Sequence, residues 1–343
     1  MRIAVWHNLQ SGGALRALHD QLKALKQRGH VLEIWTSDYS DSEFLSLDTF
    51  GKVHRLPLKE KLRQTGVDFR SESSPKRLEK LITVLKDFQK RCAEEMQRGV
   101  FDCAFVNSCS VTYMPYISEF LGIKSFLYLG EPYRWFHEAS PTNPWLPASG
   151  NLSWLEKRRD QKRLYSQSIK ISYEIGAAKK YSKILVNSRF TRENVLKAYG
   201  IESTVCYLGI DTNEFSVPSP EKKNFVVGVG LIYHAKAIER AIKLIAEIPV
   251  ALRPPLKWIA NGADKTYLDY LLKCASESNV IFEPLIRISY NELTRVLSEA
   301  LFMIYTPKLE PFGLAPLEAN ACGTFVIAIA EGGIRETISN GKN

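Results

Sequence analysis

PKLEPFGLAPLEANACG, residues 307–323, is the stretch that most strongly indicates the fold of this chain. Two carboxylates, Glu310 and Glu318, lie on either side of a loop-forming Pro-Phe-Gly and of residues typical of a helix start. The apolar run Leu301–Tyr305 just upstream is typical of a buried parallel strand. The sequence therefore predicts a strand, a loop that carries Glu310, and a helix with Glu318 about one turn into it.

The start of this predicted helix has the properties of an anion site. Its first backbone N–H groups, near Gly313 and Leu314, lack helical partners, and the helix dipole favours negative charge there. A diphosphate at that point, with a carboxylate on either side to accept hydrogen bonds from hydroxyl groups, is the pattern of a nucleotide-sugar site. The alternative is an ordinary strand and amphipathic helix whose two glutamates face solvent.

The stretch closely resembles a known family motif when it is taken together with GTFVIA at 323–328 and EGGIRE at 331–336. The family is glycosyltransferase family 4, whose members are retaining enzymes of the GT-B architecture, here with mannosyl- and rhamnosyltransferases as the nearest pattern. The resemblance extends across nearly the whole chain. It implies an α/β fold of two doubly wound, Rossmann-like domains that face a central cleft.

Length and composition agree with a soluble two-domain protein. The chain has 343 residues, 45% hydrophobic and 24% charged, which suits two domains rather than one core. No stretch approaches the roughly 20 apolar residues that span a bilayer, and the N-terminus reads as a buried strand rather than a signal peptide. The six cysteines are scattered without metal-type pairs, so we expect reduced thiols and a cytoplasmic location.

Positive charge is concentrated in one segment. The net charge is +9, and residues 151–200 hold 12 Lys+Arg against 4 Asp+Glu. These cations fall on a predicted basic helix, 154–183. An anionic membrane surface is one hypothesis for its partner, which would make the protein peripheral on the cytoplasmic membrane face. A solvated helix face is the alternative, and no nucleic-acid partner is predicted because no nucleic-acid module accompanies the patch.

Strands and helices alternate along both halves, which predicts parallel sheets covered by helices. We expect an acceptor-binding domain at 1–210, a polar, proline-containing linker at 211–224, and a donor-binding domain at 225–343. The first half contains a long predicted helix from Ser74 to about Arg98; the second half has predicted strands at 225–229, 257–260 and 280–282. Relatives continue beyond the last residues with a further strand and helices, so the resemblance implies a C-terminally truncated second domain.

The resemblance assigns roles in the second half. Lys236 matches a lysine that binds the leaving diphosphate, although a solvated helix-start lysine is the alternative. Relatives carry an arginine where this chain has Leu231, and Arg287 is a candidate substitute. Further donor-binding residues implied by the resemblance are Glu318, the turn of Phe312, Gly313 and Leu314, and the main chain of Leu285 and Ile286 after the predicted 280–282 strand.

The first half supplies candidate residues for the acceptor, and the resemblance places Gly12 and Gly13 near the donor phosphates as well. Gly12 and Gly13 open the first helix, where two glycines permit close approach of a ligand. No third glycine completes a dinucleotide fingerprint, which argues against a dehydrogenase. The relatives' histidine beside the reacting sugar falls on Gly130. Glu131 is a candidate polar substitute, with His137 more typical of an ordinary loop residue.

The last strand-to-helix turn of the first half also resembles a family string, VNSRFTRE at 186–193. Its role is predicted to be structural, with Ser188 or Thr191 as the helix cap.

The combined prediction is a retaining, metal-independent hexosyl- or deoxyhexosyltransferase. It would move a sugar from a nucleoside diphosphate sugar to a glycan or lipid-linked glycan acceptor in polysaccharide or glycoconjugate assembly, without a cofactor. Candidate catalytic residues are Glu310, Lys236 and Glu131. A second interpretation is a non-catalytic scaffold or binding subunit of a glycan assembly complex, prompted by Gly130 and Leu231. A third is another GT-B enzyme, such as a nucleotide-sugar epimerase or a phosphorylase.

Overall fold

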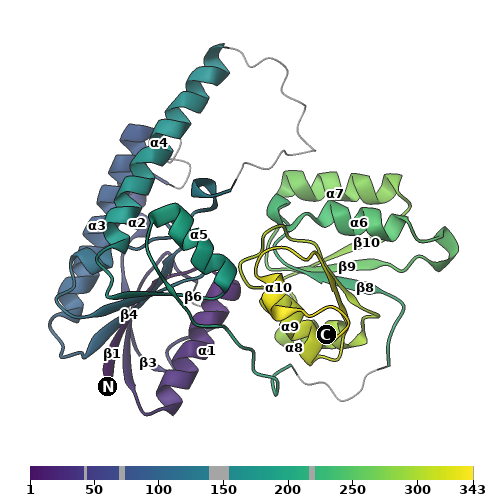
Figure 1. Cartoon of the computed structure of the whole chain (residues 1–343), viewed down its shortest axis with the longest axis horizontal. Coiled ribbons are helices and arrows are strands. Elements are labelled where there is room, and N and C mark those ends of the chain that lie inside the picture. Colours follow the sequence, from purple (N-terminus) through teal and green to yellow (C-terminus); the bar gives the residue numbers. More distant parts are fainter. Residues whose placement is uncertain (42–44, 69–73, 139–153, 216–220, 343) are drawn as a thin grey trace. The chain divides into compact units, whose positions relative to one another are not determined.

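The computed structural model describes residues 1–41, 45–68, 74–138, 154–215 and 221–342. The described residues up to Tyr207 form one compact unit, and those from Leu208 onward form a second. Each unit is a parallel sheet with helices on both faces (Figure 1). We call them the N-terminal and C-terminal domains.

The N-terminal sheet has seven parallel strands in the order β3-β2-β1-β4-β5-β6-β7. Its strands are β1 (Arg2–Asn8), β2 (Val31–Ser37), β3 (Gly51–Leu56), β4 (Cys103–Cys109), β5 (Ser125–Leu129), β6 (Lys183–Val186) and β7 (Thr204–Val205). Its helices are α1 (Gly13–Gln27), α2 (Lys59–Thr65), α3 (Pro75–Met96), α4 (Trp154–Ala178) and α5 (Arg189–Tyr199), with 3-10 turns η2 (Ile117–Glu119) and η3 (Arg134–Phe136). Strand order reverses between β1 and β4, the place where ligands bind in open α/β sheets.

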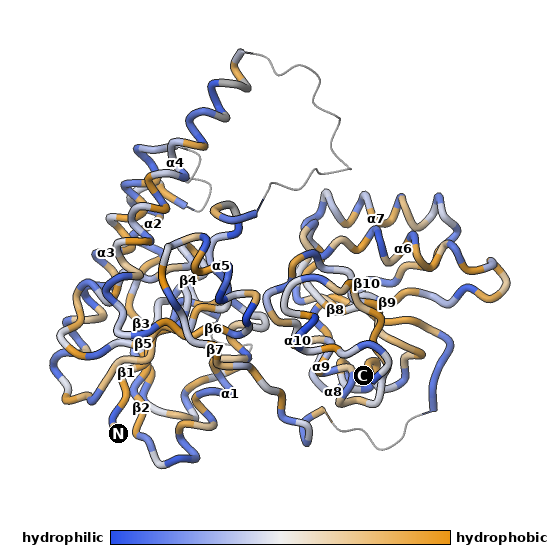
Figure 2. Tube along the Cα trace, viewed as in Figure 1, coloured by the Kyte–Doolittle hydropathy of each residue, from blue (hydrophilic) through white to orange (hydrophobic). Residues whose placement is uncertain are grey.

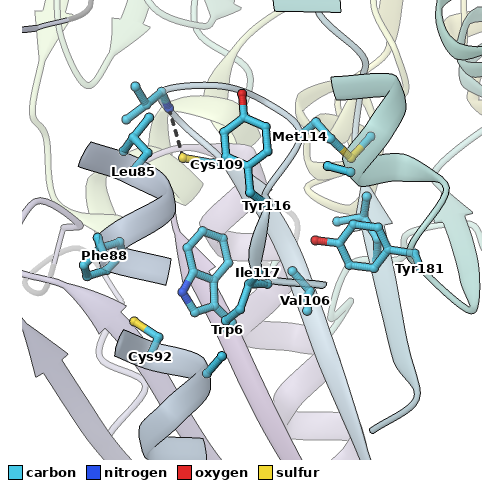
Figure 3. Close-up of a cluster of buried hydrophobic side chains, with 14 of the residues drawn as sticks. Trp6, Leu85, Phe88, Cys92, Val106, Cys109, Met114, Tyr116, Ile117 and Tyr181 are labelled. Carbon is cyan, nitrogen blue, oxygen red and sulfur yellow. Dashed lines mark hydrogen bonds between the residues drawn. The ribbon is translucent and has the colours of Figure 1, made fainter. Parts of the chain in front are cut away.

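Two apolar layers hold this domain together. Leu15, Leu18 and Leu22 of α1 follow helical spacing and cover one face of the sheet. On the other face, α3 packs Leu85 and Phe88 against strand residues that include Trp6 and Val106, and all of these side chains are buried. Figure 3 shows this second layer, with Trp6 enclosed between α3 and the segment around Tyr116 and Ile117. Each fully buried large apolar side chain of this kind contributes about 1.5–3 kcal/mol of transfer free energy.

The C-terminal sheet has five parallel strands in the order β10-β9-β8-β11-β12. Its strands are β8 (Val226–Val229), β9 (Leu256–Ala260), β10 (Phe282–Ile286), β11 (Met303–Tyr305) and β12 (Val326–Ala328). Its helices are α6 (Ile238–Ala246), α7 (Lys265–Glu277), α8 (Tyr290–Glu299), α9 (Leu314–Ala321) and α10 (Ile334–Thr337), with 3-10 turns η4 (His234–Lys236) and η5 (Val250–Leu252). The order reverses between β8 and β11, so the loops after these two strands meet at the switch point.

The predicted alternation of strands and helices is confirmed, and several boundaries are corrected. The basic helix ends at Ala178 rather than at 183, because Lys183 begins β6. Lys236 lies in the η4 turn and not on the following helix. The strand expected at 280–282 is β10, so Leu285 and Ile286 lie within a strand instead of after it. Pro284 is tolerated there because β10 is an edge strand, whose outer N–H positions need no partner.

The polar stretch predicted as a linker packs into the C-terminal domain where the structure describes it. Phe215 is 2% exposed and contacts the ring of Tyr290 at 5.5 Å between centroids. The Cys322 thiol donates to the Phe215 carbonyl at 3.1 Å. Lys223 pairs with Glu299 at 2.8 Å. Residues 216–220 lie outside the described part of the chain.

Candidate active site

The loops after β8 and β11 bring two predicted catalytic residues together. The Lys236 ammonium lies 2.8 Å from a carboxylate oxygen of Glu310. Both side chains are about one fifth exposed, at 23% and 18%. The Lys236 carbonyl in turn accepts a hydrogen bond from the Thr306 hydroxyl at 3.0 Å. Residues 74 positions apart in sequence therefore form one charged centre at the switch point of the sheet.

Unusual backbone conformations next to Lys236 and Glu310 set the directions of these two side chains. Gly230 has φ of +150°, and a Cβ there would lie 3.4 Å from the Lys236 side chain, which packs against the bare glycine. Ala237, directly after Lys236, has φ of +48°, and Leu309, directly before Glu310, has φ of +49°. Left-handed conformations at non-glycine residues are costly and occur preferentially at functional sites. The strain thus falls on the two residues that flank the charged pair.

Helix α9 begins at Leu314 with Gly313 as its N-cap, at the predicted place, and carries Glu318 on its second turn. Gly313 has φ of +91°, and a Cβ there would lie 2.3 Å from Ile334, so only glycine fits. Pro316 lacks an N–H, which leaves Gly313, Leu314 and Ala315 as the amide donors of the first turn. The Phe312 side chain is buried, so this residue is able to contribute to a ligand site only through its backbone.

Glu318 is only 6% exposed, and its charge acts on two buried neighbours. Burial raises the pKa of Tyr305 well above its ordinary value, and the charges of Glu310 and Glu318 add to this effect. Burial also raises the pKa of the Cys322 thiol to about 11, again with a contribution from Glu318. The hydroxyl of Tyr305, the last residue of β11, therefore stays protonated within the electrostatic field of both carboxylates. No sequence motif singles it out.

The turn at Gly332 and Gly333, which was not among the predicted site residues, packs against the backbone of the Glu310 loop. The N–H of Gly333 donates to the Glu310 carbonyl at 2.8 Å. A Cβ on Gly332 would lie 2.6 Å from that same carbonyl oxygen, and one on Gly333 would lie 2.1 Å from the Pro311 oxygen. The glycine pair in EGGIRE contributes to the family resemblance, but its contact with the loop follows from the tertiary structure alone.

The structure also places the two residues of the C-terminal domain that concern the missing family arginine, Leu231 and Arg287. Leu231 is 49% exposed at the edge of the site, where a cation was expected. Arg287 follows β10 with φ of +57°, and its Nε donates to the Asn261 carbonyl at 3.4 Å. Among the described residues no contact between Arg287 and Lys236 or Glu310 is present. Ile286 is exposed at the carboxyl end of β10 and Leu285 is partly buried, within the strand.

In the N-terminal domain, the glycine pair opens α1 as predicted. Gly12 has φ of +143°, and a Cβ added there would have no atom within 4 Å, so the space above the helix start is open. Gly130 and Glu131 follow β5 directly and are partly buried. Ser188 caps α5 by accepting from the Thr191 N–H at 2.9 Å, which confirms the predicted cap.

The loop that follows Glu131 is held by its own charges and by α4. The His137 side chain is 3% exposed and lies 3.5 Å from Glu138, so it is a buried structural residue. Burial raises the pKa of Glu138, but hydrogen bonding from His137 and the charge of Arg134 outweigh it and lower the pKa below its ordinary value. The ammonium of the buried Lys170 on α4 lies 3.6 Å from the centre of the Tyr133 ring. The loop is therefore anchored to the helix that follows it.

Known proteins that are similar to this chain are glycosyltransferases. A family model described as "Glycosyl transferases group 1" matches residues 209–343. The described part of the C-terminal domain therefore matches a glycosyltransferase family, and the chain is similar to GT4-like glycosyltransferases. The predicted GT-B fold is confirmed by solved structures: the crystal structure of Anabaena Alr3699/HepE in complex with UDP has a TM-score of 0.67 over 100% of this chain and 84% of that chain, at 17% identity. WaaG, a glycosyltransferase involved in lipopolysaccharide biosynthesis, has a TM-score of 0.64 over 98% and 83%, at 16% identity.

Curated proteins that are similar to this chain include mannosyltransferases. Mouse GDP-Man:Man(3)GlcNAc(2)-PP-Dol alpha-1,2-mannosyltransferase is 30% identical over 170 residues, which cover 44% of this chain and 34% of the relative. Alpha-1,3/1,6-mannosyltransferase ALG2 of Dictyostelium discoideum is 29% identical over 224 residues, 53% of this chain and 52% of the relative. The matched regions thus span a third to a half of the length of these relatives.

Neither a membrane-spanning helix nor a cluster of metal ligands occurs among the described residues. Within the part of the chain that the structure describes, no helix is long and apolar enough to cross a membrane. In the same residues, no group of three or more His, Cys, Asp and Glu side chains has an arrangement able to hold a metal ion.

Proposed function

We propose that this chain is a retaining glycosyltransferase that transfers a sugar from a nucleoside diphosphate sugar to a glycan or lipid-linked glycan acceptor. The observation that carries the proposal is the 2.8 Å pairing of Lys236 with Glu310 beside the start of α9 and the buried Glu318. A cation, a set of helix-start amides and two carboxylates at one switch point match the chemical parts of such a donor: a diphosphate with a hydroxylated sugar on each side.

In this proposal each group has one task. Glu318 accepts hydrogen bonds from the ribose hydroxyls, and the amides of Gly313 and Leu314 bind the diphosphate. Lys236 stabilises the charge that develops on the departing phosphate, which is the largest electrostatic demand of the step. Glu310 holds a sugar hydroxyl and stabilises the developing positive charge on the sugar ring.

Main-chain groups of Leu285 and Ile286, at the end of β10, hold the base. The cationic side chain and helix start supply the positive charge, so we propose that transfer requires no metal.

The retaining step balances without a protein base. The bond from the acceptor oxygen to the anomeric carbon forms on the face from which the phosphate departs, as the bond from that carbon to the phosphate oxygen breaks. The acceptor hydroxyl proton passes to the departing phosphate. We propose that the acceptor binds the N-terminal domain near Gly12 and Gly13, with Glu131 accepting a hydrogen bond from it.

Donor binding is tested by calorimetry with UDP, GDP, ADP and dTDP on the parent chain, on Glu318→Ala and on Glu247→Ala as an exposed control of the same charge. We expect one nucleotide to bind selectively, with binding lost in Glu318→Ala and kept in Glu247→Ala. Equal nucleotide binding by the two variants would contradict the proposed donor site. Turnover with the selected donor, measured with and without EDTA, tests metal independence, and the anomeric configuration of the product tests retention.

A non-catalytic scaffold remains the second candidate, favoured by the exposed Leu231 in place of a cation and by Gly130 in place of the relatives' histidine. Nucleotide binding without release of nucleoside diphosphate, in the presence of acceptor-rich membrane extract, would support it. Restoration of turnover by Leu231→Arg would instead show that the missing cation limits catalysis.

Helix α4 supports a peripheral membrane location as part of this proposal. Its outer end, which extends beyond the rest of the N-terminal domain (Figure 1), exposes Trp154, Leu155, Leu164 and Tyr165 by 60–63%. Arg158 lies 4.1 Å from the centre of the Trp154 ring, and hydrophilic and hydrophobic residues alternate along the helix (Figure 2). Cations beside exposed aromatic side chains suit an anionic lipid surface.

Co-sedimentation with phosphatidylglycerol and phosphatidylcholine vesicles tests this location. We expect binding to the anionic vesicles at low salt, a loss in Arg158→Glu/Arg159→Glu, and no loss in the control Lys179→Glu/Lys180→Glu at the other end of the helix region. Equal binding to both vesicle types would exclude it.

A further inference from the structure

A cavity of about 300 Å³ lies in the N-terminal domain, apart from the residues assigned above. It is lined by Glu33, Trp35, His54, Glu95, Arg98, Gly99 and Phe101. Glu33 lies in the amino-terminal half of β2, and Gly99 and Phe101 directly precede β4. Glu33 is thus four residues, or about 13 Å of strand, from the carboxyl end of β2. The cavity opens near the opposite end of the sheet from Gly12 and Glu131.

Three of the lining side chains are aromatic rings that pack on one another. The rings of Trp35 and His54 are stacked with centroids 4.4 Å apart and planes 5° apart. Phe101 meets Trp35 edge-on at 5.6 Å, and the Arg2 guanidinium lies 5.5 Å from the centre of the Phe101 ring. Register explains the stack, because Trp35 of β2 is paired with His54 of β3 on the same face.

The two carboxylates are fixed in orientation by the same side chains. Glu95 accepts from the Trp35 indole N–H at 3.3 Å. Glu33 lies 3.2 Å from the His54 imidazole and 3.5 Å from the Arg2 guanidinium. Arg98 lies three residues after Glu95, at the end of α3, and is exposed at the rim. The cavity therefore offers preoriented acceptors and a guanidinium donor beside an apolar wall, which lowers the ordering cost of binding.

These groups select against a charged ligand. An anion would meet the carboxylates of Glu33 and Glu95, and a cation would meet the guanidinium of Arg98. A hydroxyl group both donates and accepts, so neighbouring hydroxyls on one ring satisfy a carboxylate and a guanidinium at once, while the ring's C–H face contacts Phe101. The volume is at the lower end of the range for small-ligand pockets, about 300–1,000 Å³.

We propose that this cavity binds one neutral sugar residue of a glycan, remote from the transfer site. Such a site gives the N-terminal domain a second point of attachment to a saccharide, and a second attachment raises the effective concentration of the chain to be modified. The proposal concerns binding alone and does not depend on turnover at Glu310.

Ligand-detected NMR and calorimetry on the full chain test the proposal, with methyl α-D-mannopyranoside and methyl α-D-glucopyranoside as probes and inorganic phosphate and spermidine as charged comparisons. We expect weak, millimolar-range binding of at least one glycoside and none of the charged compounds. Glu95→Gln/Arg98→Ala should weaken glycoside binding at least tenfold, because it removes the carboxylate charge and the guanidinium donor. The glutamine side chain still accepts the hydrogen bond from the Trp35 indole, so the wall of the cavity is kept. The control Lys90→Gln/Glu94→Gln changes an exposed pair on the same helix and should have no effect.

Four outcomes would overturn the proposal: no glycoside binding by the parent chain, equal binding in the cavity variant, preferential binding of phosphate or spermidine, or loss of glycoside binding in Glu318→Ala. The Glu318→Ala variant separates the two proposed sites. Loss of glycoside binding in that variant would place the sugar at the donor site, whereas loss of nucleotide binding with glycoside binding intact is the expected result. Thermal unfolding of each variant verifies that it is folded.

Discussion

Gly333→Ala is a direct test of how the Glu310 loop is positioned. Gly333 has φ of −71° and ψ of −14°, a conformation that alanine adopts freely, so the substitution adds no backbone strain. Its Cβ would nevertheless lie 2.1 Å from the Pro311 oxygen and 2.6 Å from the Pro311 carbonyl carbon. Ordinary carbon-to-oxygen contacts are about 3.3 Å or longer. The loop must therefore move by about 1 Å, next to the carboxylate that pairs with Lys236.

The expected consequence is larger for turnover than for nucleotide binding. A displacement of about 1 Å at a reacting centre can reduce rate by about 100-fold, while overpacking costs about 1–3 kcal/mol of stability. Glu318, on α9 rather than on the displaced loop, should keep nucleotide affinity within a few-fold. We would measure release of nucleoside diphosphate from the sugar donor, nucleotide affinity by calorimetry, and the melting temperature.

Gly209→Ala is the matched control, because Gly209 has no atom within 4 Å of its Cβ position and no positive φ. It should leave the rate, the affinity and the melting temperature unchanged. If Gly333→Ala retained the parent's rate, the reasoning would be refuted, since the loop would then tolerate the shift. A variant that lost nucleotide affinity and rate together would show that the turn supports the domain rather than the position of Glu310.

Three further predictions concern stability. Burial, with a contribution from Arg55, lowers the pKa of His7 from 6.5 to about 3. The contribution of the neutral His7 to the free energy of unfolding is complete above pH 6.5 and is lost as the pH falls toward 3, by up to about 1.4 kcal/mol per pH unit. In a series of urea denaturations at different pH values, His7→Gln should flatten the dependence of stability on pH between 6.5 and 3. Burial and the nearby Glu174 raise the pKa of Tyr199, so the free energy of unfolding should begin to fall above pH 10, and less steeply in Tyr199→Phe. Lys222 donates to the carbonyls of Ser298 and Gly323 and to the Thr324 hydroxyl at 2.8–3.0 Å; because the residue is exposed, Lys222→Met should cost about 1–2 kcal/mol, and a melting temperature equal to that of the parent would contradict this.

The regular alternation of elements was predictable because buried strands and amphipathic helices leave strong local patterns. The short helix α2 was missed since it buries one side chain, Leu62, although Gly66 at its C-cap has the left-handed conformation that marks helix ends. The strand β10 was placed too early because Pro284 reads as a strand breaker, and its edge position becomes known only from the sheet order.

The candidate site was predictable to the extent that its residues belong to one motif. Glu310, Gly313 and Glu318 follow from local spacing. The pairing of Glu310 with Lys236 required the order β8-β11 in the sheet, which sequence spacing does not give. Tyr305 and Gly333 were not predicted as site residues, because their roles depend on which residues they contact in the folded chain and not on their residue type.

The Lys236–Glu310 ion pair sets a condition on every anion that enters the site. An inorganic phosphate or sulfate ion that displaces Glu310 from Lys236 offers that carboxylate no hydrogen-bond donor and leaves it to water, because the Glu310 side chain is 18% exposed. A sugar nucleotide supplies both an anion for the lysine and hydroxyl groups for the glutamate, so each charge trades one partner for another. Under the proposed function, this ion pair would favour molecules that carry a diphosphate and a sugar together over simple inorganic anions.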